Sequence, residues 1–144
     1  MRRTIMLAGA AALSLLVAVP VRAHHAFAAA YDENLPLDLQ GTVTKVLLVN
    51  PHSFIWIDVK AKDGTTVHWE IEGGPPNSLL RHGFTRRSLP VGSQIRVVGY
   101  QSKFGPGKAV GAFLTYADGR KVFMGGSAPG ALGQPTGGDQ AAPR

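Results

Sequence analysis

The feature that most constrains the fold is a pair of alternating stretches on either side of Asp63 and Gly64. Residues 53–60 and 65–72 alternate apolar and polar side chains and are rich in β-branched and aromatic residues, a pattern typical of strands that bury one face. A three-residue turn at 62–64, with Gly64 in the left-handed conformation, pairs the two stretches as an antiparallel hairpin. A two-residue turn would pair core-facing with solvent-facing residues, so we exclude it.

This register divides the hairpin into two faces. The predicted pairs on the buried face are Val59 with Val67, Ile57 with Trp69, and Ile55 with Ile71. The predicted pairs on the outer face are Asp58 with His68, Trp56 with Glu70, and Phe54 with Glu72. We expect Phe27 or Tyr31 from an N-terminal arm to cover the two outer aromatic rings, because exposed aromatic pairs on small domains are usually covered.

Four further stretches have strand-like composition, namely 39–49, 93–101, 109–116 and 120–124. The first contains Gly41, where a long strand can bend, and Asp118-Gly119 predicts a later hairpin turn. Only the segment 75–83 predicts a helix, with prolines at its start, Asn77 or Ser78 as its cap, an apolar face of Leu79 and Leu80, and Gly83 at its end. The order of elements predicts an all-β fold with one short helix, a small OB-like barrel of five to six strands.

The N-terminal segment 1–23 predicts a signal peptide. Two arginines precede an apolar run, and Val21-Arg22-Ala23 places small side chains where a signal peptidase cleaves; the run is short for a membrane span. Cleavage after Ala23 would leave His24 as the first residue, and an alternative cleavage after Ala28 would remove both neighbouring histidines. We therefore expect a periplasmic or secreted protein that does not span the membrane after cleavage.

The remaining chain divides into an N-terminal arm at 24–31, the OB-like domain at 32–124 and a tail at 125–144. The tail holds six glycines, three prolines and four alanines, a composition that predicts disorder. The formal charge falls from +6 to +3 without the three arginines of the signal segment. This small charge, with export and no interleaving of basic and aromatic residues, argues against nucleic-acid binding. The chain has no cysteine, which excludes disulfides and thiolate sites.

The motifs HHAFAAAYD, GTVTKV, NPH and PNSLLRHGF…SLPVG resemble those of a bacterial family of short exported proteins catalogued as domain of unknown function 6152. The resemblance covers residues 24–124. It implies a signal-bearing, OB-like protein without assigned chemistry, and it draws attention to the residues that carry the motifs: His24, His25, Phe27, Asn50, Pro51 and His52.

The histidines predict a transition-metal site. A terminal histidine offers an amine with a pKa of about 8 and an imidazole near 6.5, and such nitrogen ligands suit Cu(II), Zn(II) or Ni(II), with copper first by affinity. If the arm folds back, His24, His25 and His52 supply three imidazoles to one ion. Asp32 and Glu33 could be their hydrogen-bond partners, although a helix start or solvated charges are the simpler interpretation of both. The competing interpretation is a solvated chain start, with His52 bonded to loop backbone.

Other residues offer alternatives. The outer face of Phe54, Trp56, His68 and Glu70 could bind an envelope protein, a peptide or a glycan. Asp58, His68 and Glu70 have acid–base potential, but a cross-strand ion pair is the simpler interpretation. The basic residues near the predicted helix, Arg81, His82, Arg86 and Arg87, could bind an anion or form a hydrated face. A small metal-dependent hydrolytic or redox enzyme is a third, weaker hypothesis.

Overall fold

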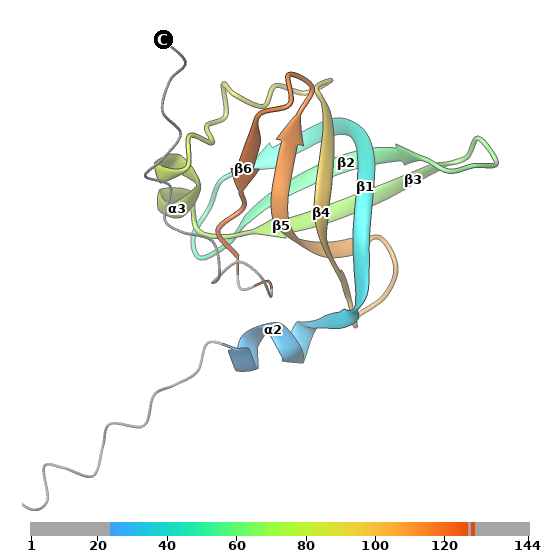
Figure 1. The fold of residues 1–144 in the computed structure, drawn as a ribbon, viewed down its shortest axis with the longest axis horizontal. Coiled ribbons are helices and arrows are strands. Elements are labelled where there is room, and N and C mark those ends of the chain that lie inside the picture. The colour runs from blue at the N-terminus through green and yellow to red at the C-terminus, as the bar shows by residue number, and fades with distance from the viewer. Residues whose placement is uncertain (1–23, 127, 129–144) are drawn as a thin grey trace, which may run out of the picture.

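The structure is a computed structural model that describes residues 24–126 and 128. The predicted signal peptide and most of the tail lie outside the described residues. The elements are α2 (His24–Ala30), β1 (Tyr31–Leu47), β2 (Ser53–Lys60), β3 (Thr66–Gly73), α3 (Pro76–Arg81), β4 (Gln94–Ser102), β5 (Lys108–Tyr116) and β6 (Lys121–Phe123) (Figure 1).

The six strands form a mostly antiparallel sheet in the order β3-β2-β1-β4-β5-β6, and a further β3–β5 pairing closes five of them into a ring. The β3–β5 pairing is parallel and spans Glu70 to Glu72. This ring, with α3 between β3 and β4, confirms the predicted β-rich fold and is compatible with a small OB-like barrel. The short strand β6 adds to the outside of β5.

β1 joins the two halves of the ring because it pairs with both β4 and β2. The change of partner falls at Thr42, which is aligned with Gln94 on one side and Asp58 on the other. A Cβ atom on the neighbouring Gly41 would lie 2.6 Å from the carbonyl oxygen of Asp58. The glycine predicted to permit a bend is therefore also required for close approach of the two backbones.

The predicted β2–β3 register is confirmed at every pair, and Gly64 has the expected positive φ of 85°. The buried face is shorter than predicted. Ile55, Ile57 and Ile71 are fully buried, whereas Val67 is 39% exposed. The reason is that β3 pairs with β5 only from Glu70 onward, so the tip of the hairpin extends beyond the ring (Figure 1).

The predicted helix is present as α3 with two differences. It begins at Pro76 with Pro75 as its N-cap and no side-chain cap, so Asn77 and Ser78 lie within it. Leu79 is fully buried but Leu80 is 51% exposed, because a single turn presents only one of two adjacent side chains to the core. Gly83 follows the helix with a positive φ of 79°, as expected.

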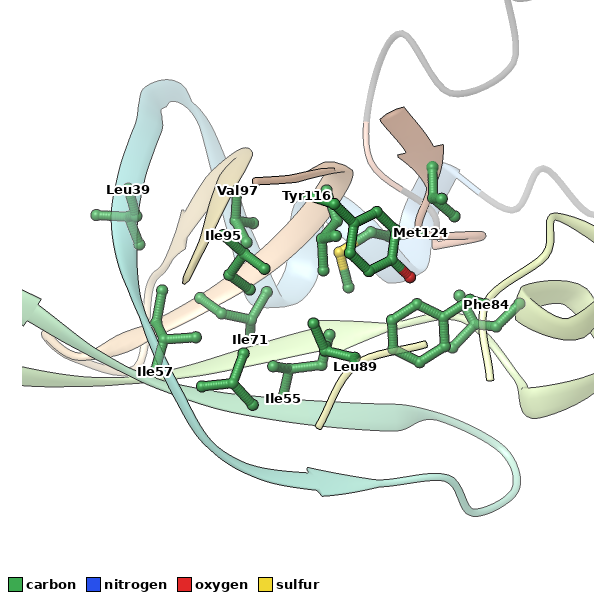
Figure 2. Close-up of a cluster of buried hydrophobic side chains, with 14 of the residues drawn as sticks. Leu39, Ile55, Ile57, Ile71, Phe84, Leu89, Ile95, Val97, Tyr116 and Met124 are labelled. Atoms are coloured by element: carbon green, nitrogen blue, oxygen red, sulfur yellow. The ribbon is translucent and has the colours of Figure 1, made fainter. Parts of the chain in front are cut away.

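The main core fills the ring. Side chains from the strands and from the segment after α3 point toward one another in Figure 2. The labelled members are Leu39, Ile55, Ile57, Ile71, Phe84, Leu89, Ile95, Val97, Tyr116 and Met124. The segment between α3 and β4 therefore contributes to the core through Phe84 and Leu89, both almost completely buried.

A second, smaller apolar cluster holds the N-terminal arm. Its buried members are Phe27, Tyr31, Val110, Ala112 and Ala128. The arm is helical, as α2, and β1 begins at Tyr31 rather than at Leu39. A helix of seven residues is not stable alone, so its packing on this cluster accounts for its order. Ala128 of the predicted tail is buried in the same cluster.

Candidate functional site

The most specific polar arrangement in the described residues lies at the corner between β1 and β2. His52 precedes β2, and its Nδ1 atom lies 2.7 Å from Oε1 of Glu72 on β3. The His52 side chain is 51% exposed and that of Glu72 is 23% exposed. A neutral imidazole that donates its Nδ1 proton to a carboxylate keeps an unprotonated Nε2 atom, which can bind a metal ion.

The second oxygen of Glu72 is also engaged. The Tyr31 hydroxyl donates a hydrogen bond of 2.5 Å to Oε2 of Glu72. Burial, and then this hydrogen bond, raise the pKa of Tyr31 well above its usual range, so the hydroxyl remains a donor at neutral pH. With both oxygens bonded, the carboxylate is fixed in one orientation and in turn orients the His52 ring.

Tyr31 is positioned by the end of α2. The Ala30 carbonyl accepts a 2.9 Å hydrogen bond from the Lys103 amide, and the Ala28 carbonyl accepts one of 2.7 Å from Lys103 Nζ. These bonds satisfy carbonyls that a helix end leaves without partners, and the lysine charge favours the helix C-terminus. The Phe27 ring packs edge-on against Tyr100 at 5.4 Å and also contacts Tyr31 at 5.8 Å.

His24 and His25 form the first residues of α2, but their side chains lie outside what the structure describes. The structure therefore places the helix that carries them directly before Tyr31 and leaves their convergence with His52 a prediction. Among the side chains that the structure describes, no group of three histidine, aspartate or glutamate residues is arranged to hold a metal ion.

The predicted partners Asp32 and Glu33 do not serve His52 in the described part of the chain. Oδ1 of Asp32 accepts hydrogen bonds from the backbone amide and the side chain of Asn34, at 2.9 and 3.2 Å, and Glu33 is exposed. Both residues lie in β1. Glu72 takes the expected role instead.

The outer aromatic face is present but is not covered as predicted. Phe54 and Trp56 lie 5.9 Å apart between ring centroids, and Lys45 Nζ lies 4.4 Å from the Trp56 ring. Phe27 packs with Tyr100 and Tyr31 in the second cluster instead. The prediction that the arm covers this pair was wrong because α2 finds its apolar contacts over β4 and β5.

The residues with predicted acid–base potential, Asp58, His68 and Glu70, form two separate ion pairs. His68 Nδ1 lies 2.6 Å from Asp58 Oδ1, and its side chain is 79% exposed. This confirms the cross-strand pair, which contributes little to stability at such exposure. Glu70 faces Lys108 of β5 instead, at 3.9 Å, so the three residues do not form one acid–base group.

The basic residues after β3 are exposed on and after α3. Arg81, Arg86 and Arg87 are solvent-facing. His82 Nδ1 donates a 2.8 Å hydrogen bond to the Ser78 carbonyl, and its ring lies edge-on to Phe123 at 5.3 Å. His82 therefore has a structural role in ending α3.

Sequence reasoning missed the roles of Glu72 and Tyr31, although one signal was present. The predicted register already placed Glu72 opposite Phe54, two residues after His52 on the same outer face. Such diagonal neighbours are within reach of long side chains. Nothing local predicts the Tyr31 contact, because 41 residues separate it from Glu72.

No described helix is long and apolar enough to cross a membrane. No curated protein and no solved structure matches the chain. A family model described as a family of unknown function, DUF6152, matches residues 12–112, which include β1, β2, β3, α3, β4 and the first half of β5. The chain that carries the Tyr31–Glu72–His52 arrangement thus belongs to the DUF6152 family.

Proposed function

We propose that the protein is exported and binds a transition-metal ion, copper in the first place, through His52 together with His24 and His25. The mature chain would begin at His24, so that its α-amino group and imidazole chelate the ion. It would act as a binding protein for copper storage, delivery or sensing in the periplasm or outside the cell.

The observation that carries this proposal is the bond between His52 and Glu72. Histidines that bind metals almost always donate their second ring nitrogen to a carboxylate or carbonyl, which fixes the ring and makes it a stronger ligand. Glu72 Oε1 occupies that position at 2.7 Å, and Tyr31 holds the carboxylate from its other side. The half-exposed His52 ring supports binding of an ion delivered from solvent.

The choice of copper rests on ligand chemistry. Imidazole and amine nitrogens suit Cu(II), Ni(II) and Zn(II), and Cu(II) binds most tightly of the three at a given site. The proposed ligands are all nitrogen atoms, and the chain has no cysteine that could supply a thiolate. Zinc and nickel would bind the same atoms more weakly.

The test begins with the intact mass and N-terminal sequence of the exported protein. Material that begins at His24 should then bind one Cu(II) in a titration followed by isothermal calorimetry. A single glycine added before His24 should greatly weaken binding, because it removes the terminal amine from the chelate. A mature chain that begins at Ala29, or equal binding by the extended protein, would refute the proposal.

A second candidate function is an interaction module that uses Phe54 and Trp56. The observation that favours it is that α2 packs elsewhere, so that this aromatic pair stays partly exposed. Its ligand would be a peptide, a glycan or another envelope protein. Trp56→Ala should abolish such binding and leave copper binding intact, whereas the glycine extension should have the opposite effects.

A further inference from the structure

A cavity of about 280 Å³ lies between the end of α2, β3 and the loop from β4 to β5. Its lining residues are Ala30, Tyr31, Glu70, Glu72, Ser102, Phe104, Lys108 and Ala109. This volume is just below the usual range for ligand pockets, which begins at about 300 Å³. It fits a small molecule or a single long side chain.

The walls of the cavity differ in chemistry. The lining combines the apolar residues Ala30 and Phe104 with the carboxylates of Glu70 and Glu72. Phe104 stands at the loop side with 77% of its surface exposed, although its backbone amide is fixed by a 3.1 Å hydrogen bond to Ser102 Oγ. An exposed phenyl ring on a fixed backbone is an apolar contact for a ligand.

The two carboxylates are not equivalent. Glu72 is bonded to Tyr31 and His52 on its two oxygens. Glu70 contacts Lys108 Nζ at 3.9 Å, which is too long for a hydrogen bond. Both oxygens of the Glu70 carboxylate can therefore accept a hydrogen bond from a ligand in this cavity.

We propose that this cavity binds an alkylammonium group, with the ammonium on Glu70 and the attached methylene chain against Phe104 and Ala30. The negative charge of two carboxylates against one lysine favours a cation, and the apolar wall favours an alkyl chain on it. The lining does not include His52, although Glu72 bonds to it, and amine binding does not require a metal.

An alkylammonium group can come from a free diamine or from a lysine side chain. Both are tested by titrating chelator-treated protein with 1,4-diaminobutane and with Nα-acetyl-lysine methylamide, followed by ¹⁵N–¹H NMR. Saturable shifts at the amides of Glu70, Phe104 and Lys108 support the proposal with either probe. Binding of the diamine alone indicates a small-molecule ligand, and binding of the lysine amide indicates a peptide.

Two variants test the named contacts. Glu70→Gln should weaken binding about tenfold or more, the effect of losing one charge-assisted hydrogen bond, whereas Glu33→Gln, at an exposed acid outside the cavity, should not. Phe104→Ala should weaken binding, whereas Val91→Ala, at another exposed apolar residue, should not. Preserved spectra show that each variant is folded.

Three results would overturn the proposal. They are no saturable shift with either amine, equal binding of the neutral 1,4-butanediol, and unchanged affinity in folded Glu70→Gln protein. Because metal is removed throughout, these results leave the copper proposal unaffected.

Discussion

His52 and Glu72 meet through a bond of 2.7 Å between Nδ1 and Oε1, although one residue precedes β2 and the other is the last but one of β3. The hairpin register brings them together diagonally, and Tyr31 adds a third group from the end of the N-terminal arm. The arrangement links the corner that carries His52 to the helix that carries His24 and His25.

Replacement of Glu72 by glutamine should weaken copper binding about 10- to 100-fold, the usual effect of removing a partner of a metal-bound histidine. The amide can still accept a hydrogen bond from Tyr31, so the free energy of unfolding should change by only about 1 kcal/mol. Competition with a chromophoric chelator measures the affinity. Glu33→Gln serves as the matched control, and equal affinities for the two variants would contradict the role given to Glu72.

Replacement of Tyr31 by phenylalanine should lower the free energy of unfolding at pH 7 by about 1–2 kcal/mol, because it removes a hydrogen bond to a carboxylate and keeps the buried ring. The effect should also depend on pH. Burial and then the Glu72 bond raise the pKa of Tyr31 in the folded state, while an unfolded tyrosine titrates near pH ~10. The contribution is thus fully present below about pH 10 and decreases as pH rises above it.

Urea denaturation of wild type and Tyr31→Phe between pH 8 and 11 measures this difference. The gap in stability between the two proteins should narrow above about pH 10. A gap that widens with rising pH would contradict the assigned direction of the pKa shift.

Replacement of Ser53 by alanine should raise the free energy of unfolding by about 1 kcal/mol. The Ser53 hydroxyl is buried without a hydrogen-bond partner in the described structure, and such a group costs its desolvation energy. The matched control is Ser102→Ala. The Ser102 hydroxyl is also buried but donates to the Ala30 carbonyl and accepts from the Phe104 amide, so its loss should be destabilising. Thermal denaturation distinguishes the two signs.

Replacement of Gly99 by alanine should lower the free energy of unfolding by about 2–4 kcal/mol through overpacking. An added Cβ atom would lie 1.9 Å from the Val110 carbonyl oxygen, and backbone cannot move aside cheaply. Gly126→Ala is the control, since its nearest atom would lie at an ordinary 3.4 Å. Similar stabilities of the two variants would show that β4 and β5 approach less closely than described.

The sequence predicts those parts of the fold that depend on local pattern. The β2–β3 register follows from the alternation of apolar and polar side chains and from the three-residue turn, in which Gly64 adopts a positive φ. The end of α3 follows from Gly83 in the same way. Each of these depends on residues close to one another in the sequence, where periodicity and turn chemistry decide the structure.

The parts that sequence reasoning misses depend on distant contacts. The helix of the arm is stabilised by the packing of Phe27 against Tyr100. No local sequence pattern identifies Tyr100 as that partner. For the same reason the arm does not cover Phe54 and Trp56, which stay partly exposed. The carboxylate for His52 was expected from Asp32 or Glu33, yet it comes from β3, where the predicted register already placed Glu72 on the correct face.

The measurement that most directly tests the central claim is pulsed EPR of the Cu(II)-loaded mature protein, which counts the imidazoles bound to the ion. His52→Ala should lose one imidazole coupling and bind copper more weakly. His68→Ala should leave the spectrum unchanged, although His68 is also an exposed histidine paired with a carboxylate, at 2.6 Å. An unchanged spectrum and affinity in His52→Ala would contradict the account.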